Sequence, residues 1–153
     1  MLLTVFSQWF GYIYDTVFNI FHPDFQDSVF WYFFESGFYV KLGLIFILIP
    51  LGFMSVFYYL CYYPYGRWWH WLILLVIAIL VVFGTTYGYS RSFILGSNAQ
   101  EMILCYNVEE CSEYIQALPM KYAWVNTILG SLIGFIGSLL LKQGSKVQTH
   151  LPF

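Results

Sequence analysis

Three uncharged, hydrophobic stretches dominate the pattern along the chain, at residues 42–61, 71–89 and 122–141. An α-helix rises about 1.5 Å per residue, so each stretch is long enough to cross a hydrocarbon core of roughly 30 Å. The first two are joined by a short connection that contains Pro64 and Gly66, which are typical turn residues. The pattern therefore predicts three transmembrane helices, of which the first two form an antiparallel hairpin.

The first 21 residues show a different pattern, because apolar side chains recur there every three or four positions. This period is typical of an amphipathic helix. We expect the helix to lie in the membrane interface, with Trp9 reaching into the acyl boundary. The alternative is a fourth spanning helix, which the charge of Asp15 makes costly.

Two prolines mark local features within the helical segments. Pro50 lies in the middle of the first span, where it removes a backbone hydrogen bond and predicts a helix kink. Pro119 is expected to end a short helix over residues 109–118, in the polar loop before the third span.

The predicted fold class is an all-α integral membrane protein, with a single membrane domain over residues 1–153. Its segments are an interfacial helix (1–21), an aromatic helix and first span (29–63), a second span (68–90), a polar loop with short helices (91–121), a third span (122–141) and a basic tail (142–153).

Small and polar residues share one face of the third span. They are Asn126, Gly130, Gly134, Gly137 and Ser138. Small residues spaced four apart let two helix backbones approach closely in lipid, where van der Waals packing holds them together. We therefore expect this face, called the 126–138 face below, to be the helix-packing and oligomerisation surface.

Composition agrees with a membrane location and excludes some functions. Only 9% of the residues are charged, whereas about 25% is usual in a soluble domain. The net charge is −2 and the six Lys and Arg are scattered, so nucleic acid binding is not expected. The lipid bilayer is the expected partner, together with copies of the chain or other membrane subunits.

The polar loop contains two cysteines and four glutamates of interest. Cys105 and Cys111 would form a disulfide if the loop faces an oxidising compartment, and spacing alone leaves their pairing open. In an oligomer built on the 126–138 face, an acidic outer rim would attract cations. That rim would consist of Glu101, Glu109, Glu110 and Glu113. The plainer interpretation is that these glutamates only solvate a loop.

No constellation in the sequence indicates enzymatic chemistry. His22, His70 and His150 are far apart, so no metal site is expected, and no cofactor motif is present. Ser28 and Ser36 lie near Glu35 without any motif that would activate them, so no catalytic residue is assigned and we expect no enzyme. The three spans contain no Asp, Glu, Lys, Arg or His. This absence argues against proton-coupled transport and against a voltage sensor.

Orientation rests on a weak asymmetry. With three spans, three basic residues flank each side of the membrane, so the positive-inside count is a tie. All eight acidic residues lie on the N-terminal side, which leaves that side negative. We therefore expect the N-terminus outside and the C-terminus in the cytoplasm.

These observations predict a non-enzymatic, multi-pass membrane protein that acts by oligomeric assembly. In the first interpretation it is a structural or anchoring subunit of a larger membrane complex. The alternative is a homo-oligomeric channel or pore with the acidic outer rim. Conductance separates the two, because a pore leaks ions when it is reconstituted alone and an anchor does not.

Overall fold

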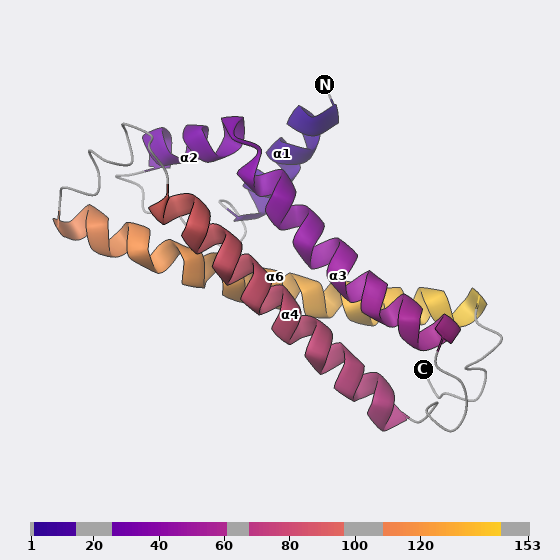
Figure 1. Cartoon of the computed structure of the whole chain (residues 1–153). Helices are drawn as coiled ribbons and strands as arrows, with labels where there is room; N and C mark the ends of the chain where they lie inside the picture. Colours follow the sequence, from indigo (N-terminus) through magenta and orange to yellow (C-terminus); the bar gives the residue numbers. More distant parts are fainter. Residues whose placement is uncertain (1, 15–25, 61–67, 97–108, 145–153) are drawn as a thin grey trace.

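The computed structural model describes residues 2–14, 26–60, 68–96 and 109–144, and all of its elements there are helical. In chain order they are α1 (Leu2–Tyr12), α2 (Gln26–Glu35), α3 (Phe38–Leu60), α4 (Trp68–Leu95) and α6 (Glu109–Gly144). Figure 1 shows α3 and α6 running toward the same end of the molecule, with α4 running in the opposite direction between the two ends.

Three of these helices are long and apolar enough to cross a membrane. They are α3, α4 and the Cys111–Gly144 part of α6. Each presents many large apolar side chains on the outside, such as Leu48, Leu80 and Leu140. The prediction of an all-helical chain with three helices of this kind is confirmed.

The α3 helix begins at a backbone turn that only glycine adopts easily. Gly37 follows the end of α2 and has a φ of 67°, in the left-handed region where a side chain is strained. Its amide donates to the Phe34 carbonyl at 3.3 Å, which closes the end of α2. The expected aromatic segment is therefore divided into two helices that meet at an angle (Figure 1).

The third spanning helix starts earlier than the sequence suggests. We expected a short helix to end at Pro119, but α6 is continuous over 36 residues and contains this proline. That expectation is wrong. Pro119 removes one internal hydrogen bond, yet buried Ile115, Leu118 and Tyr122 pack on both sides of it and hold the helix together.

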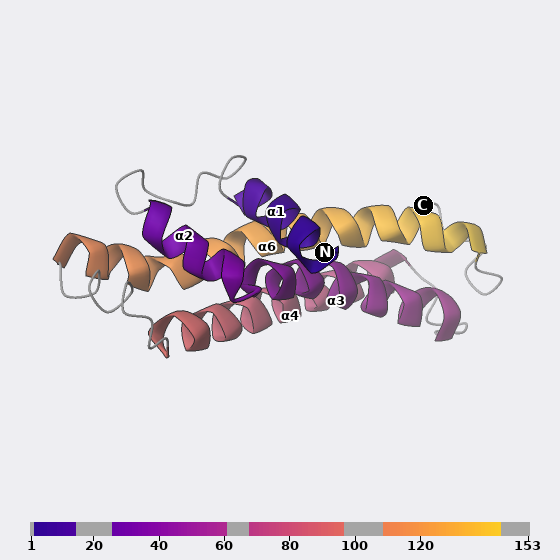
Figure 2. The same cartoon turned by 90° about the horizontal axis from the view of Figure 1, so that it is seen from above.

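The N-terminal helix α1 packs against the bundle and crosses α3 near the beginning of α3 (Figures 1 and 2). Small residues of α1 face inward, since Ser7 and Gly11 are buried, while Trp9 is 68% exposed. The Phe10 ring covers Gly43 of α3 and meets the Phe46 ring edge-on, with centroids 5.7 Å apart. Residues 15–21 of the predicted interfacial helix lie outside the described residues, and its position in a membrane interface stays a prediction.

Two buried clusters fill the two ends of the bundle. The first, here called the aromatic end, lies where α3 begins, and α1 and α2 cover it. It contains Tyr14, Phe33, Phe38, Tyr39, Ile94, Cys111, Ile115, Leu118, Tyr122 and Val125 among its buried residues. The second, here called the glycine end, contains buried Met54, Phe57, Tyr58 and Trp71 together with the contacts of Gly130, Gly134 and Gly137.

Candidate functional site

The three glycines of the 126–138 face lie against α3 and α4 of the same chain. A methyl group on Gly130 would lie 3.4 Å from a Val82 methyl carbon and 3.5 Å from Pro50 Cγ. At Gly134 it would lie only 2.8 Å from Leu75 Cδ1 and 3.3 Å from Pro50 Cβ. The glycines thus let the α6 backbone approach both neighbours closely, as small residues do in membrane bundles.

A polar contact stands at the start of this face, where Asn126 is fully buried. Its side-chain amide donates to the Leu42 carbonyl at 3.2 Å and to Thr86 Oγ1 at 3.1 Å. Its oxygen accepts a hydrogen bond from the Tyr14 hydroxyl. Asn126 therefore joins α6 to α3, to α4 and to Tyr14, the second residue after α1, with three of its hydrogen-bonding positions used.

Tyr14 keeps the proton that this contact requires. Burial raises the pKa of its phenol well above the usual range, although the hydrogen bond to Asn126 acts in the opposite direction. The hydroxyl is therefore protonated at neutral pH and acts as the donor.

A second polar contact stands at the other end of the face. Ser138 is fully buried, and its hydroxyl oxygen accepts a hydrogen bond from Trp71 Nε1 at 2.8 Å. The Tyr58 hydroxyl lies 2.9 Å from the same oxygen, and either group can donate. Ser138 thus joins α6 to both α3 and α4, about 18 Å along the helix from Asn126.

These contacts show what the 126–138 face packs against within the chain. We expected Asn126, Gly130, Gly134, Gly137 and Ser138 to form a helix-packing and oligomerisation face. All five contact other helices of their own chain, so they pack helices within it, and their part in oligomerisation stays a prediction. Gly137, for instance, lies against the Leu51 side chain of α3. Within the described residues, the face packs α6 against α3 and α4.

The sequence did not reveal the partners of the two polar residues. Tyr14, Thr86, Tyr58 and Trp71 lie 40 to 112 positions away from the groups that they contact. One signal was available, since hydroxyl and indole groups inside uncharged spans must find hydrogen-bond partners in lipid. That signal identifies residues that need a partner but does not pair them.

Pro50, the predicted kink, lies inside the continuous helix α3. It is buried where Gly130 and Gly134 of α6 face it, so its ring fills the space that the missing side chains leave. The structure therefore gives Pro50 a packing role, while the kink itself stays a prediction.

The expected loop features are only partly within the described residues. Cys111 is buried and disulfide-bonded in α6. Its predicted partner, Cys105, lies outside the described residues, as does Glu101, so the pairing stays a prediction. Glu109 and Glu110 begin α6, and Glu113 is exposed on its first turns. The acidic rim of an oligomer stays a prediction as well.

Basic residues at the aromatic end each lie over a tyrosine ring. Lys41 Nζ is 5.8 Å from the Tyr89 centroid, and Lys121 Nζ is 4.9 Å from the Tyr114 centroid. The Arg91 guanidinium is 6.0 Å from the Tyr87 centroid. Such cation–π pairs combine an amphipathic ring with a charge, and both side-chain types are enriched where a membrane meets water.

One pair of glycines faces away from the bundle. Gly84 and Gly88 are exposed on α4, one turn apart, and a methyl group on either would meet no atom within 4 Å. They continue an exposed apolar line on the same side of α4, formed by Ile73, Ile77 and Leu80. This outer line, here called the α4 outer face, is an apolar surface with two open glycines that the rest of the described chain leaves uncovered.

The described residues contain no group of three or more His, Cys, Asp or Glu side chains that would hold a metal ion. Comparisons with protein families, with characterised proteins and with solved structures find no match to this chain.

Proposed function

We propose that this chain is an integral membrane protein with three spans, whose aromatic end faces the outside and whose C-terminus is cytoplasmic. Three long apolar helices with apolar outer surfaces support insertion. The tyrosine–cation pairs at the aromatic end fit a membrane boundary at that depth. The disulfide-bonded state of Cys111 supports an outward orientation, because disulfides persist in oxidising compartments.

We further propose that it is a non-enzymatic subunit of a larger membrane complex and binds a transmembrane helix of another subunit. The observation that carries this proposal is the glycine pair of the α4 outer face. Gly84 and Gly88 are exposed and meet nothing within 4 Å, whereas Gly130 and Gly134 of α6 contact other helices of the chain. In lipid, an open pair of glycines four residues apart suits the close approach of a second helix.

The pore alternative has less support. It needs the 126–138 face to surround an axis with copies of itself, and that face already contacts α3 and α4. The exposed side chains around the bundle are predominantly apolar, which suits lipid or a partner helix better than a water-filled channel.

The test is native mass spectrometry of the protein purified gently from its own membranes, comparing two variants. In the first, Gly84→Leu and Gly88→Leu fill the α4 outer face. We expect this double variant to stay folded and to lose its co-purifying subunit. The matched control is Gly52→Leu, because Gly52 is also exposed with nothing within 4 Å but has Leu48 and Val56 one turn away.

The control variant should keep the subunit. If the double variant retains the same partner as the unchanged protein, the α4 outer face is not the binding surface. If only identical copies are recovered, the chain self-associates and is not an accessory subunit of a mixed complex.

A further inference from the structure

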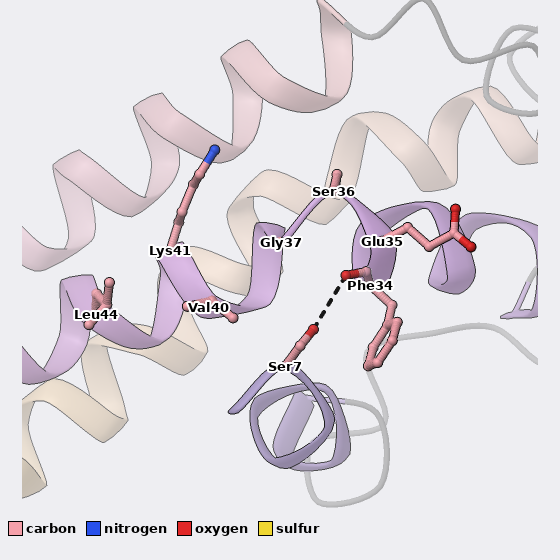
Figure 3. A pocket seen from close by; sticks show the side chains of 8 residues that line it. All are labelled: Ser7, Phe34, Glu35, Ser36, Gly37, Val40, Lys41 and Leu44. Atoms are coloured by element: carbon pink, nitrogen blue, oxygen red, sulfur yellow. Dashed lines mark hydrogen bonds between the residues drawn. The ribbon is translucent and has the colours of Figure 1, made fainter. Parts of the chain in front are cut away.

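A pocket of about 650 Å³ lies at the turn between α2 and α3, next to α1. Figure 3 shows Gly37 between Glu35 and Lys41, whose side chains extend in different directions, with Ser7 of α1 below them. A methyl group on Gly37 would meet nothing within 4 Å, so the space beside its backbone is open. The pocket therefore combines an open backbone turn with an acidic and a basic side chain.

The two serine hydroxyls of the pocket donate to backbone carbonyls and can still accept a hydrogen bond. Ser7 Oγ donates to the Phe34 carbonyl at 3.4 Å, and Ser36 Oγ donates to the Phe33 carbonyl at 3.1 Å. A hydroxyl has one hydrogen and two lone pairs, so each oxygen can still accept a bond. Together with the exposed Glu35 carboxylate, the two serines give the pocket three lining side chains that can accept a hydrogen bond from a cation with N–H groups.

A positive charge stands on another side of the pocket. Lys41 is exposed, and its ammonium lies 5.8 Å from the Tyr89 centroid, close to the outer limit for a cation–π contact. The ammonium carries three hydrogens, and a ring face leaves them able to bond an anion such as a phosphate. The pocket thus offers one group for a phosphate and several for an ammonium.

Beyond the charged residues the wall becomes apolar and continues along α3. Val40 and Leu44 line the pocket, and exposed Leu48 follows one turn after Leu44 on the same face. Lys41 immediately precedes the uncharged stretch of residues 42–61. A molecule with a charged head and a hydrocarbon tail would therefore find its head at Lys41 and its tail beside the leucines.

We propose that this pocket binds one phospholipid with an ethanolamine headgroup. Its phosphate accepts hydrogen bonds from Lys41, its primary ammonium donates to Glu35 and the serine oxygens, and an acyl chain lies along Leu44 and Leu48. A choline headgroup has no N–H to donate, so it fits the acceptors less well. This proposal rests on the proposed membrane insertion of α3.

The experiment is native mass spectrometry of the purified full chain in detergent, with a phosphatidylethanolamine, a phosphatidylcholine or a phosphatidylglycerol of the same acyl chains added in turn. We expect one bound lipid that is retained best when it is the phosphatidylethanolamine. Glu35→Gln should remove the preference over phosphatidylcholine, and Lys41→Gln should weaken both zwitterionic lipids roughly threefold, as expected for exposed charge pairs.

The control variants remove the same charges elsewhere at the aromatic end. Glu113→Gln and Lys121→Gln change exposed residues of α6 outside the pocket and should leave lipid retention unchanged. Equal retention of all three lipids, a preference for phosphatidylglycerol, or no effect of Glu35→Gln would each overturn the proposal.

A separate measurement distinguishes this proposal from the one on which it rests. Membranes that contain the protein are washed with alkaline carbonate, which releases proteins that are not embedded. If the chain remains in the membrane but shows no lipid preference, only the pocket proposal is overturned. If the wash releases the chain, membrane insertion is wrong and the lipid site falls with it.

Discussion

The two ends of the bundle solve the same packing problem with opposite kinds of side chain. At the aromatic end, Phe38 lies among the rings of Phe33, Phe93 and Tyr122, with centroids 4.8, 4.8 and 5.4 Å away. At the glycine end, Gly134 has no side chain, and its backbone lies against Pro50 and Leu75. Large rings fill one end, and missing side chains bring the helices together at the other.

The difference follows from how many elements meet at each end. Side chains of α2 and α4, together with Tyr14, join α3 and α6 around the aromatic end, so wide spaces between helices need large rings. The glycine end is built from α3, α4 and α6, and these approach through glycines. In lipid, where apolar burial gives little driving force between helices, both solutions depend on close van der Waals contact.

The largest effect is expected when the aromatic end loses a ring. Phe38→Ala should lower the free energy of unfolding by about 3 kcal/mol, because it leaves a cavity among rings that cannot collapse fully. Titration with a denaturing detergent in mixed micelles measures this loss. Phe38→Leu is the matched control, and its smaller volume change should cost about 1 kcal/mol. Equal losses for the two variants would show that ring packing does not hold this end together.

The glycine end should respond to the opposite change. Gly134→Leu adds a side chain where even a methyl group would lie 2.8 Å from Leu75 and 3.3 Å from Pro50. We expect a loss of about 2 kcal/mol in the same titration, as is typical of overpacking.

Gly84→Leu is the control for this substitution, because that position is open within the chain. It should change the free energy of unfolding by less than about 0.5 kcal/mol. A Gly134→Leu variant as stable as the control would mean that α6 does not pack on α3 and α4 through this glycine.

The smallest effects are expected from the two polar contacts, one near each end. Asn126→Ala removes three hydrogen bonds and leaves Tyr14 and Thr86 without this partner, for a loss of about 1.5 kcal/mol. Ser138→Ala removes two hydrogen bonds and should cost about 1 kcal/mol. If both variants unfold at the same detergent fraction as the unchanged protein, the polar contacts do not stabilise the bundle.

Much of the fold was accessible from the sequence because its strongest signal is length. The three charge-free stretches correspond to α3, α4 and α6, which are long and apolar enough to cross a membrane. Helix ends were harder. Pro119 reads as a stop by local rules, yet side-chain packing on both sides of it keeps α6 continuous, so tertiary contacts overrode the local signal.

The candidate site was predictable in kind but not in its partner. The spacing of Gly130 and Gly134 correctly indicated a packing face, and nothing in a single sequence distinguishes a neighbour in the same chain from a second copy. The α4 outer face was missed, because Gly84 and Gly88 have the same four-residue spacing as Gly130 and Gly134 and the sequence does not show which pair is covered by other helices. Only the structure separates the covered pair from the open one.

The most direct test of the account asks which helix faces Gly130. A variant with Gly130→Cys and Val82→Cys, and with the three native cysteines replaced by Ala, is oxidised in membranes and analysed by mass and by gel without reductant. Val82 lies in contact with the Gly130 position in the same chain, so we predict an internal disulfide in a monomer. Disulfide-linked dimers without the internal bond would contradict the account and restore self-association through α6.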